Sequence, residues 1–493
     1  MERFDLVVIG AGPSGYAAAM RAIDFKKKTL LIEKAKVGGA GVTNGALSSK
    51  TWWELSREAS AFRKNLKRYN IKAPHVIYKE IQGEVRKAVQ ERKSMLEEHM
   101  LKLKNSNYSQ LLQFKTGTAR LLDANEIEIT KGAQTEVVWA ENIILATGSR
   151  PRYLPELPID EKIVMTSEGI EDMDDFPESM VIVGAGVIGC EFATIFSGFG
   201  RTKVHLIDKG DRILPFEDED VVRIIERNME NNDVLIHRNS RLINMKKVNE
   251  RVEYELEYND GSRETFNVEK ALVSVGRIAN LEDLWDDKVG IDISKRGIDN
   301  NDTQTNVPNI YAVGDLTADI SLVNVGELEG RYAVEKIFGK PLRQLVYENI
   351  STIMFLSPEV AGVGLNENQA QEKEIDYKVV TLEYSTIPRA IAKRNTQGFI
   401  KLLVTNDDAM KILGMKVVGN NASSAIQAVA VLISMDKGIE ELAECVHPHP
   451  SITEGIQECA RMLMGKSLFK PAALLGRLSC RRWVKGIYED IIF

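Results

Sequence analysis

Two glycine-rich segments have the residue types and spacing to hold a dinucleotide. The first, Gly10-Ala11-Gly12-Pro13-Ser14-Gly15, follows an apolar run, and Glu33 ends the next apolar run. Glycines let the backbone turn tightly against a pyrophosphate, the N–H groups that begin a helix face the phosphates, and an acid accepts hydrogen bonds from ribose hydroxyls. Residues 5–33 therefore predict a strand, turn, helix and strand that bind a dinucleotide.

The same pattern returns at residues 180–208. Gly184-Ala185-Gly186-Val187-Ile188-Gly189 lies between two apolar runs, and the second run ends in Asp208. An acid at this position favours a free 2′-hydroxyl and repels a 2′-phosphate, so we expect NAD(H) rather than NADP(H). Lys209 and Arg212 lie close enough in sequence to weaken that preference.

Two further apolar segments close on small turns, Ile144-Leu145-Ala146-Thr147-Gly148-Ser149 and Ile310-Tyr311-Ala312-Val313-Gly314-Asp315. With this order of motifs the chain resembles the pyridine nucleotide–disulfide oxidoreductase family from residue 1 to about 465. It is most similar to the dihydrolipoamide dehydrogenases and secondarily to the soluble pyridine nucleotide transhydrogenases. Segments 271–277, with Asn280, 357–360 and 447–454 add to the resemblance.

The resemblance implies that the first site holds FAD, that the second binds the nicotinamide dinucleotide, and that Asp315 reaches the ribityl chain of the flavin. Besides the two glycine-rich turns and their acids, it assigns cofactor contacts to a scattered set of residues: Lys34, Gly39, Thr43, Lys50, Ala119, Thr147, Gly148, Ser149, Glu191, Gly276, Gly314, Leu322 and Val323.

One segment departs from the family. Its members carry two cysteines shortly after the first acid, and here Gly41 and Ala46 stand at those positions, within residues 38–50. Neither side chain can form a thiolate or a mixed disulfide, so ordinary disulfide reductase chemistry is excluded. The transhydrogenases also lack the second cysteine, although they keep the first and must accept both nicotinamide nucleotides.

Four candidate catalytic residues remain by resemblance. Lys50 matches a lysine near the flavin N5, and Glu191 matches its ion-pair partner beside the nicotinamide; such a pair acts through position and charge. His449 and Glu454 match an acid–base dyad that each subunit lends to its partner. Without thiols, this dyad either protonates another substrate or bridges the dimer interface. His447 is expected to be structural.

We therefore expect an FAD-dependent oxidoreductase that accepts hydride from NADH and passes electrons to a non-disulfide acceptor: NAD(P)⁺, a quinone or oxygen. One alternative is a dihydrolipoyl dehydrogenase-like enzyme that acts on a thiol or disulfide substrate without the usual dithiol. Another is a non-catalytic flavoprotein that serves as a binding subunit.

The predicted fold class is α/β, with two nested Rossmann-like domains and a C-terminal α+β dimerisation domain that forms a homodimer. The predicted boundaries are 1–155 with 279–345 for the FAD domain, 156–278 for the NAD(P) domain and 346–465 for the dimerisation domain. Spaced apolar residues in 55–106 predict long amphipathic helices, and the apolar stretch 425–435 predicts a buried helix.

Composition limits the other classes of function. A net charge of -7 argues against nucleic-acid binding, and the start of the chain lacks the pattern of a signal peptide, so we expect a cytoplasmic protein. The four cysteines, Cys190, Cys445, Cys459 and Cys480, lack metal-ligand spacing and are expected to be small buried side chains without a metal.

Residues 466–493 extend beyond the family pattern, with many apolar side chains among clustered lysines and arginines. Such a basic amphipathic extension could lie on an anionic membrane or bind a partner protein. The alternative is that it packs on its own dimer, and in either case Cys480 is not expected to be redox-active.

Overall fold

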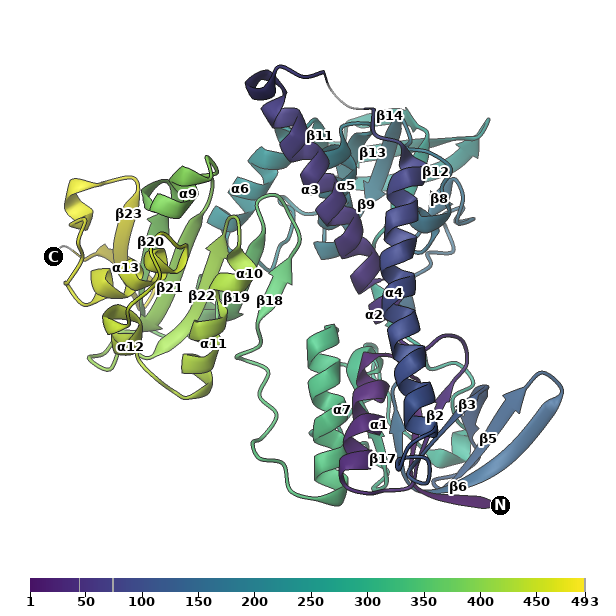
Figure 1. Ribbon diagram of the computed structural model, residues 1–493. Helices are drawn as coiled ribbons and strands as arrows, with labels where there is room; N and C mark the ends of the chain where they lie inside the picture. Colours follow the sequence, from purple (N-terminus) through teal and green to yellow (C-terminus); the bar gives the residue numbers. More distant parts are fainter. Residues whose placement is uncertain (44, 73–74, 492–493) are drawn as a thin grey trace. The chain divides into compact units, whose positions relative to one another are not determined.

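A computed structural model describes residues 1–43, 45–72 and 75–491 (Figure 1). Asn44, within the segment that lacks the cysteines, and the last two residues of the extension lie outside the described residues, as does the side chain of Lys67. The chain divides into two compact units, residues 1–176, 246–252 and 270–345 in the first, and residues 177–245, 253–269 and 346–493 in the second.

The first unit is built on a seven-stranded sheet. Six of its strands have the order β3-β2-β1-β6-β5-β4, and the seventh, β17, pairs with the C-terminal end of β6. Strand β1 alternates its buried side chains between the two faces, Val7 and Ile9 toward one core and Leu6 and Val8 toward the other. Burial on both faces is typical of parallel strands covered by helices. The strands are β1 (Glu2–Ile9), β2 (Thr29–Glu33), β3 (Leu112–Thr116), β4 (Thr118–Leu121), β5 (Glu126–Lys131), β6 (Gln134–Leu145) and β17 (Ile310–Ala312).

Helices α1 (Pro13–Asp24) and α7 (Val323–Phe338) lie side by side against this sheet (Figure 1). They approach closely because α7 has glycines at the contact: a Cβ on Gly330 would lie 2.1 Å from the Ser14 carbonyl oxygen. The predicted amphipathic helices are present as α3 (Ala46–Tyr69) and α4 (Tyr78–Lys104), which follow the short helix α2 (Gly39–Val42). This unit also contains two short strand pairs, β7 (Ser149–Pro151) with β16 (Arg277–Ala279) and β8 (Val164–Met165) with β15 (Lys270–Val273).

The second unit begins with another strand–helix–strand pattern. Strands β9 (Ser179–Val183), β10 (Lys203–Ile207) and β11 (Val234–His237) are parallel, with helices α5 (Val187–Phe199) and α6 (Glu219–Glu230) in the connections. Nine of the thirteen residues of α5 are buried, in agreement with its nearly continuous apolar sequence. The two glycine-rich turns thus lie at corresponding points, each between a parallel strand and the helix that follows it.

A seven-stranded sheet of order β18-β19-β22-β21-β20-β23-β24 forms the C-terminal part of the second unit. Helix α13 (Thr453–Leu463) packs its apolar face on β20 and β21. The strands are β18 (Thr352–Met354), β19 (Val360–Gly364), β20 (Tyr377–Glu383), β21 (Phe399–Thr405), β22 (Ile412–Val418), β23 (Leu478–Val484) and β24 (Ile487–Asp490), and the other helices include α8 (Glu367–Glu372), α9 (Pro388–Ala392), α10 (Ala422–Ala425), α11 (Gln427–Ser434) and α12 (Glu440–Glu444).

Two features of this unit differ in detail from the sequence-based expectations. The apolar stretch 425–435 does form helix α11, but the expectation of a buried helix is wrong, because Val431 is 48% exposed and Met435 is 53% exposed. Part of the apolar face of α11 is therefore left uncovered by the rest of this chain. The C-terminal extension forms the β23–β24 hairpin, in which β23 pairs antiparallel with β20 and buries Leu478 and Cys480.

No helix in the described part of the chain is both long and apolar enough to cross a membrane.

Candidate functional site

In the first glycine-rich turn, Gly10 and Gly15 are packed too tightly for a side chain, whereas Gly12 faces open space that could hold a phosphate. Gly10 has φ +106°, and a Cβ there would lie 2.3 Å from the Ala146 carbonyl oxygen, while a Cβ on Gly15 would lie 1.9 Å from the Gly10 oxygen. Nothing lies within 4 Å of a Cβ placed on Gly12, directly before α1. The open space at a helix N-terminus suits an anion.

Glu33, at the end of β2, holds this turn in place. One carboxylate oxygen accepts the Ala11 N–H at 2.8 Å, and the other accepts the Ala35 N–H at 2.8 Å. Because each carboxylate oxygen has two acceptor sites, Glu33 can still accept hydrogen bonds from ribose hydroxyls. The turn, the helix start and Glu33 therefore fit a dinucleotide such as FAD.

The second turn repeats this geometry. Gly184 has φ +102°, Gly186 again has open space beyond its α-carbon, and α5 starts one residue later. Asp208 accepts the Ala185 N–H at 2.9 Å and the Gly210 N–H at 2.8 Å. The two acids thus occupy corresponding places, and the second turn fits another dinucleotide. Val187, Ile188 and Gly189 form the first turn of α5.

A third cluster joins residues from three distant parts of the first unit. Ser149 donates from its hydroxyl to Asp315 at 2.7 Å, and Arg277 donates from Nε to the Ser149 hydroxyl oxygen at 2.8 Å. Gly314 has φ +72°, and a Cβ there would lie 2.2 Å from the Ser14 hydroxyl oxygen. The predicted residues Ser14, Ser149, Gly314 and Asp315 are therefore brought together.

Sequence reasoning missed two contributors to this cluster. Arg277 lay in a segment that supported the resemblance, but its two hydrogen bonds to Ser149 were not predicted. Glu329, which is 1% exposed on α7, accepts the Gly314 N–H at 2.6 Å. Nothing in the sequence near Glu329 signals this contact, because the two residues meet only when α7 folds back on the turn.

The remaining predicted cofactor contacts lie in loops and at element ends. Thr147 and Asn280 exchange two hydrogen bonds. Thr147 Oγ1 donates to the backbone oxygen of Asn280 at 2.8 Å, and Asn280 Nδ2 donates to the backbone oxygen of Thr147 at 2.9 Å. These bonds fix the loop of Thr147 and Gly148. Lys34 follows β2, Ala119 lies in β4, Gly276 has φ +108°, Leu322 precedes α7 and Val323 is its first residue.

The segment that lacks the cysteine pair forms α2 and the start of α3. A Cβ on Gly41 would lie 2.5 Å from Pro13 Cγ, a rigid ring atom, so this backbone leaves no space for any side chain there. The Thr43 hydroxyl donates to the backbone oxygen of Gly39 at 2.8 Å and so links the end of α2 to its first residue. Both dithiol positions therefore lack sulfur, and the first also lacks the room for it.

A cavity of about 750 Å³ lies beside this segment within the first unit. Gly41, Ala46 and Lys50 line it, together with side chains of α1 and α4 such as Tyr16 and Arg92. Most of the wall is apolar, from Val42, Leu47, Met95, Leu96 and Val323. A pocket of this kind, with a few charged groups, has the size and character of a small-molecule site.

Glu191 lies on α5 in the second unit, is 5% exposed, and accepts the Phe355 N–H at 3.0 Å. Lys50 lies on α3 in the first unit. Because the two residues belong to different units, their pairing stays a prediction.

His449 and Glu454 do meet, with His449 Nδ1 2.8 Å from Glu454 Oε1. Burial would raise the pKa of Glu454, but hydrogen bonds from His449 and from the Ser451 N–H outweigh burial and lower it. Glu454 is therefore an anion that can hold and orient the exposed imidazole of His449. His447 Nε2 lies 3.3 Å from the backbone oxygen of Leu442 in α12, the helix that precedes its loop.

The cysteines offer no replacement dithiol. Cys190, Cys459 and Cys480 are buried, and burial raises the pKa of each thiol, that of Cys480 to about 12. Cys445 is exposed, so the expectation that all four are buried is wrong for this one. Among the described residues, no group of three or more histidine, cysteine and acidic side chains could hold a metal ion.

Comparison with known proteins gives the same picture over nearly the whole chain. The sequence profile described as "Pyridine nucleotide-disulphide oxidoreductase" matches residues 4–330, and that of the family's dimerisation domain matches residues 350–460. The chain is 31% identical over 482 residues to a dihydrolipoyl dehydrogenase of Chlamydia trachomatis, covering 96% of this chain and 99% of the relative. It is 31% identical over 465 residues to that of Geobacillus stearothermophilus, covering 94% and 96%.

Solved structures agree with the sequence relatives. The structure of LpdA from Mycobacterium tuberculosis has a TM-score of 0.85 at 25% identity, covering 94% of this chain and all of that one. The flavoprotein disulfide reductase RclA from Escherichia coli has a TM-score of 0.82 at 22% identity, which supports the fold alone. With two dinucleotide turns, a dimerisation domain and relatives that align from end to end, the chain belongs to the pyridine nucleotide-disulphide oxidoreductase family, without that family's cysteine pair.

Proposed function

We propose that the protein is an FAD-dependent oxidoreductase that takes hydride from NADH and passes electrons to an acceptor that is not a disulfide. A second nicotinamide nucleotide, a quinone and dioxygen are the candidate acceptors. One observation carries this proposal: both dinucleotide turns keep their glycines and acids, whereas the first dithiol position has no space for a side chain, since Pro13 fills it.

FAD, when bound, supplies the two-electron centre that links a hydride donor to the acceptor. In the proposal, Glu33 and the first turn hold its adenosine half, and Ser149, Arg277 and Asp315 hold the ribityl region. Asp208 selects a free 2′-hydroxyl on the second nucleotide because its charge repels a phosphate. The cavity beside Gly41 and Lys50 would admit the acceptor.

Lys50 and Glu191 act through charge and position. The ammonium of Lys50 favours negative charge nearby, and Glu191, fixed by the Phe355 N–H, would orient the nicotinamide. His449, held by Glu454, would supply a proton to a reduced acceptor or join the subunits of a homodimer.

The test is anaerobic stopped-flow spectroscopy of the FAD-loaded protein. NADH should bleach the flavin quickly, and a second syringe then offers oxidised lipoamide, a quinone, a nicotinamide nucleotide or oxygen. Glu191→Gln should slow flavin reduction by about 10- to 100-fold, because it removes a charged positioning group. Glu359→Gln, which alters another buried carboxylate of the same unit, is the matched control and should reduce at the parent rate.

The outcomes separate the three hypotheses. Reoxidation by a non-disulfide acceptor with no turnover of lipoamide supports the proposal. Fast reduction of lipoamide would instead support a dihydrolipoyl dehydrogenase-like reaction on a thiol substrate. Failure of both NADH and NADPH to bleach the flavin would leave a binding subunit as the better account.

A further inference from the structure

The C-terminal hairpin lies beyond the matched dimerisation domain, which ends at residue 460, yet it is built into that domain's sheet. Strand β23 pairs with β20 from Leu478, opposite Leu382, to Trp483, opposite Tyr377. The Trp483 ring stacks on Tyr377 with centroids 5.6 Å apart and planes 14° apart. The hairpin is therefore fixed in register, and β24 follows at the edge.

From β24, Tyr488 reaches a buried carboxylate. Its hydroxyl donates to Glu367 Oε2 at 2.9 Å, and the Tyr377 hydroxyl donates to the same oxygen at 3.1 Å. The Gln371 amide donates to both tyrosine oxygens, at 2.7 Å and 2.8 Å. Both hydroxyl protons and both amide protons of these groups are thus used, and the two hydroxyls meet at one oxygen of Glu367.

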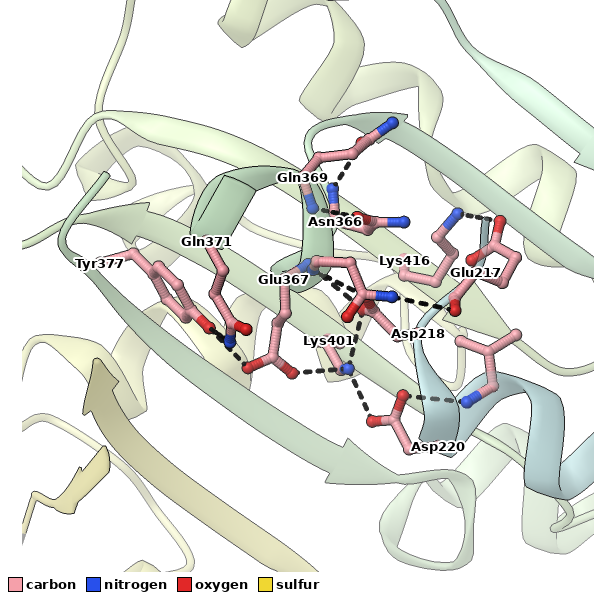
Figure 2. Close-up of polar contacts among 12 residues, drawn as sticks. Glu217, Asp218, Asp220, Asn366, Glu367, Gln369, Gln371, Tyr377, Lys401 and Lys416 are labelled. Atoms are coloured by element: carbon pink, nitrogen blue, oxygen red, sulfur yellow. Dashed lines mark hydrogen bonds and ion pairs between the residues drawn. The ribbon is translucent and has the colours of Figure 1, made fainter. Parts of the chain in front are cut away.

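The other oxygen of Glu367 binds a buried lysine. Lys401 is 1% exposed, and its Nζ lies 2.7 Å from Glu367, 3.0 Å from Asp218 and 2.6 Å from Asp220 (Figure 2). Burial alone would lower the pKa of Lys401, but these three carboxylates raise it. Because three anions share one ammonium, Glu367 depends on its hydroxyl donors as well as on Lys401.

Asp218 ends the loop that begins at the acid of the second dinucleotide turn, and Asp220 lies in the first turn of α6, directly after that loop. Asp208 starts this loop, and the Leu214 N–H donates to the Ala185 oxygen within the turn at 3.0 Å. The other end of the loop is held by two ion pairs, Glu217 with Lys416 at 2.7 Å and Asp218 with Lys401 at 3.0 Å (Figure 2). Between the turn and the buried ions, the loop contains no helix or strand.

We propose that Tyr488 is a positioning residue for the second dinucleotide site. Through Glu367 and Lys401, the C-terminal hairpin fixes the far end of loop 208–218, and with it the place of Asp208 and the Ala185 turn. The hairpin therefore sets the affinity for NADH without touching the nucleotide. This inference rests on the proposed function, because it assigns a role within the same NADH site.

The test measures the NADH dependence of flavin reduction in the full-length, FAD-loaded protein, which yields a dissociation constant and a limiting rate. Tyr488→Phe keeps the ring and removes the hydroxyl. It should weaken NADH binding by about three- to tenfold, as expected for a lost hydrogen bond to a charged group, and leave the limiting rate unchanged. Gln371→Leu removes the donor to both tyrosines and should act in the same direction.

Tyr384→Phe is the matched control. Tyr384 is fully buried in the same unit and donates to the Asn420 oxygen at 3.2 Å, outside the Lys401 cluster. This variant should keep the parent affinity for NADH even where its melting temperature falls.

Unchanged NADH affinity in both Tyr488→Phe and Gln371→Leu would overturn the inference while the proposed function stands. An equal loss of affinity in Tyr384→Phe would also overturn it, since general destabilisation would then explain the effect. If the unaltered protein shows no reduction by NADH, the proposed function fails, and the inference fails with it.

Discussion

Gly41 is the residue that most clearly separates this chain from a disulfide reductase. A missing cysteine could in principle be restored by mutation, but here Pro13 occupies the space where the first Cβ would lie. The backbone at Gly41 therefore packs so closely on Pro13 that a cysteine could not replace the glycine without moving its neighbours.

This argument predicts that Gly41→Cys combined with Ala46→Cys does not restore lipoamide reduction. Overpacking against a rigid ring should also destabilise the protein by about 1–3 kcal/mol, as measured by thermal unfolding. Ala46→Cys alone is the control and should unfold like the parent, whereas adding Pro13→Gly to the pair should relieve the clash. Lipoamide turnover and a thiolate–flavin absorbance band in the double variant would contradict the prediction.

Among the elements, β10 and β11 carry a buried histidine pair that no part of the proposed reaction uses. His205 Nδ1 lies 2.7 Å from the Tyr254 hydroxyl, and His237 Nδ1 lies 2.8 Å from that of Tyr258. Burial, and then the neighbouring His237, lower the pKa of His205 to about 4, and burial lowers the pKa of His237. Both imidazoles are therefore neutral in the folded protein at neutral pH.

The free energy of unfolding should fall as the pH drops from about 6.5 to about 4, because unfolded His205 binds a proton that the folded form excludes. Above this window both states are neutral, and below it the loss is complete. His205→Gln, which keeps a hydrogen-bonding side chain, should remove about 2 kcal/mol of this pH-dependent loss in chemical denaturation. The exposed His75→Gln is the control, and an equally steep pH dependence in His205→Gln would contradict the assignment.

Elements defined by local pattern could be predicted from the sequence, and contacts between distant segments could not. The two strand–turn–helix units followed from glycine spacing and apolar periodicity, both of which are local. The apolar stretch of α11 predicted a helix but not its exposure, because the sequence does not say whether its own chain covers that face. Lys401 lies within a strand-like apolar run, and its burial depends on Asp218, Asp220 and Glu367.

At the scale of the whole molecule, the dimerisation domain presents apolar side chains that the chain itself does not cover. Val431 and Met435, in and directly after α11, are about half exposed. Isolated apolar side chains on a surface are ordinary, but these lie within a domain whose family profile is that of dimerisation. A homodimer that covers them would also allow His449, which is 70% exposed, to act in the partner's site.

We therefore predict that Val431→Asp yields monomers in analytical ultracentrifugation. A carboxylate facing an apolar interface is left without a partner, a change that costs about 3–5 kcal/mol and shifts a dimer toward monomers at micromolar concentration. Turnover with the acceptor should fall by about tenfold or more if His449 serves the other subunit, while the extent of flavin reduction by NADH persists. Ile293→Asp changes an equally exposed apolar residue of the first unit and should stay dimeric. A Val431→Asp protein that remains dimeric would place the interface on another face of the domain.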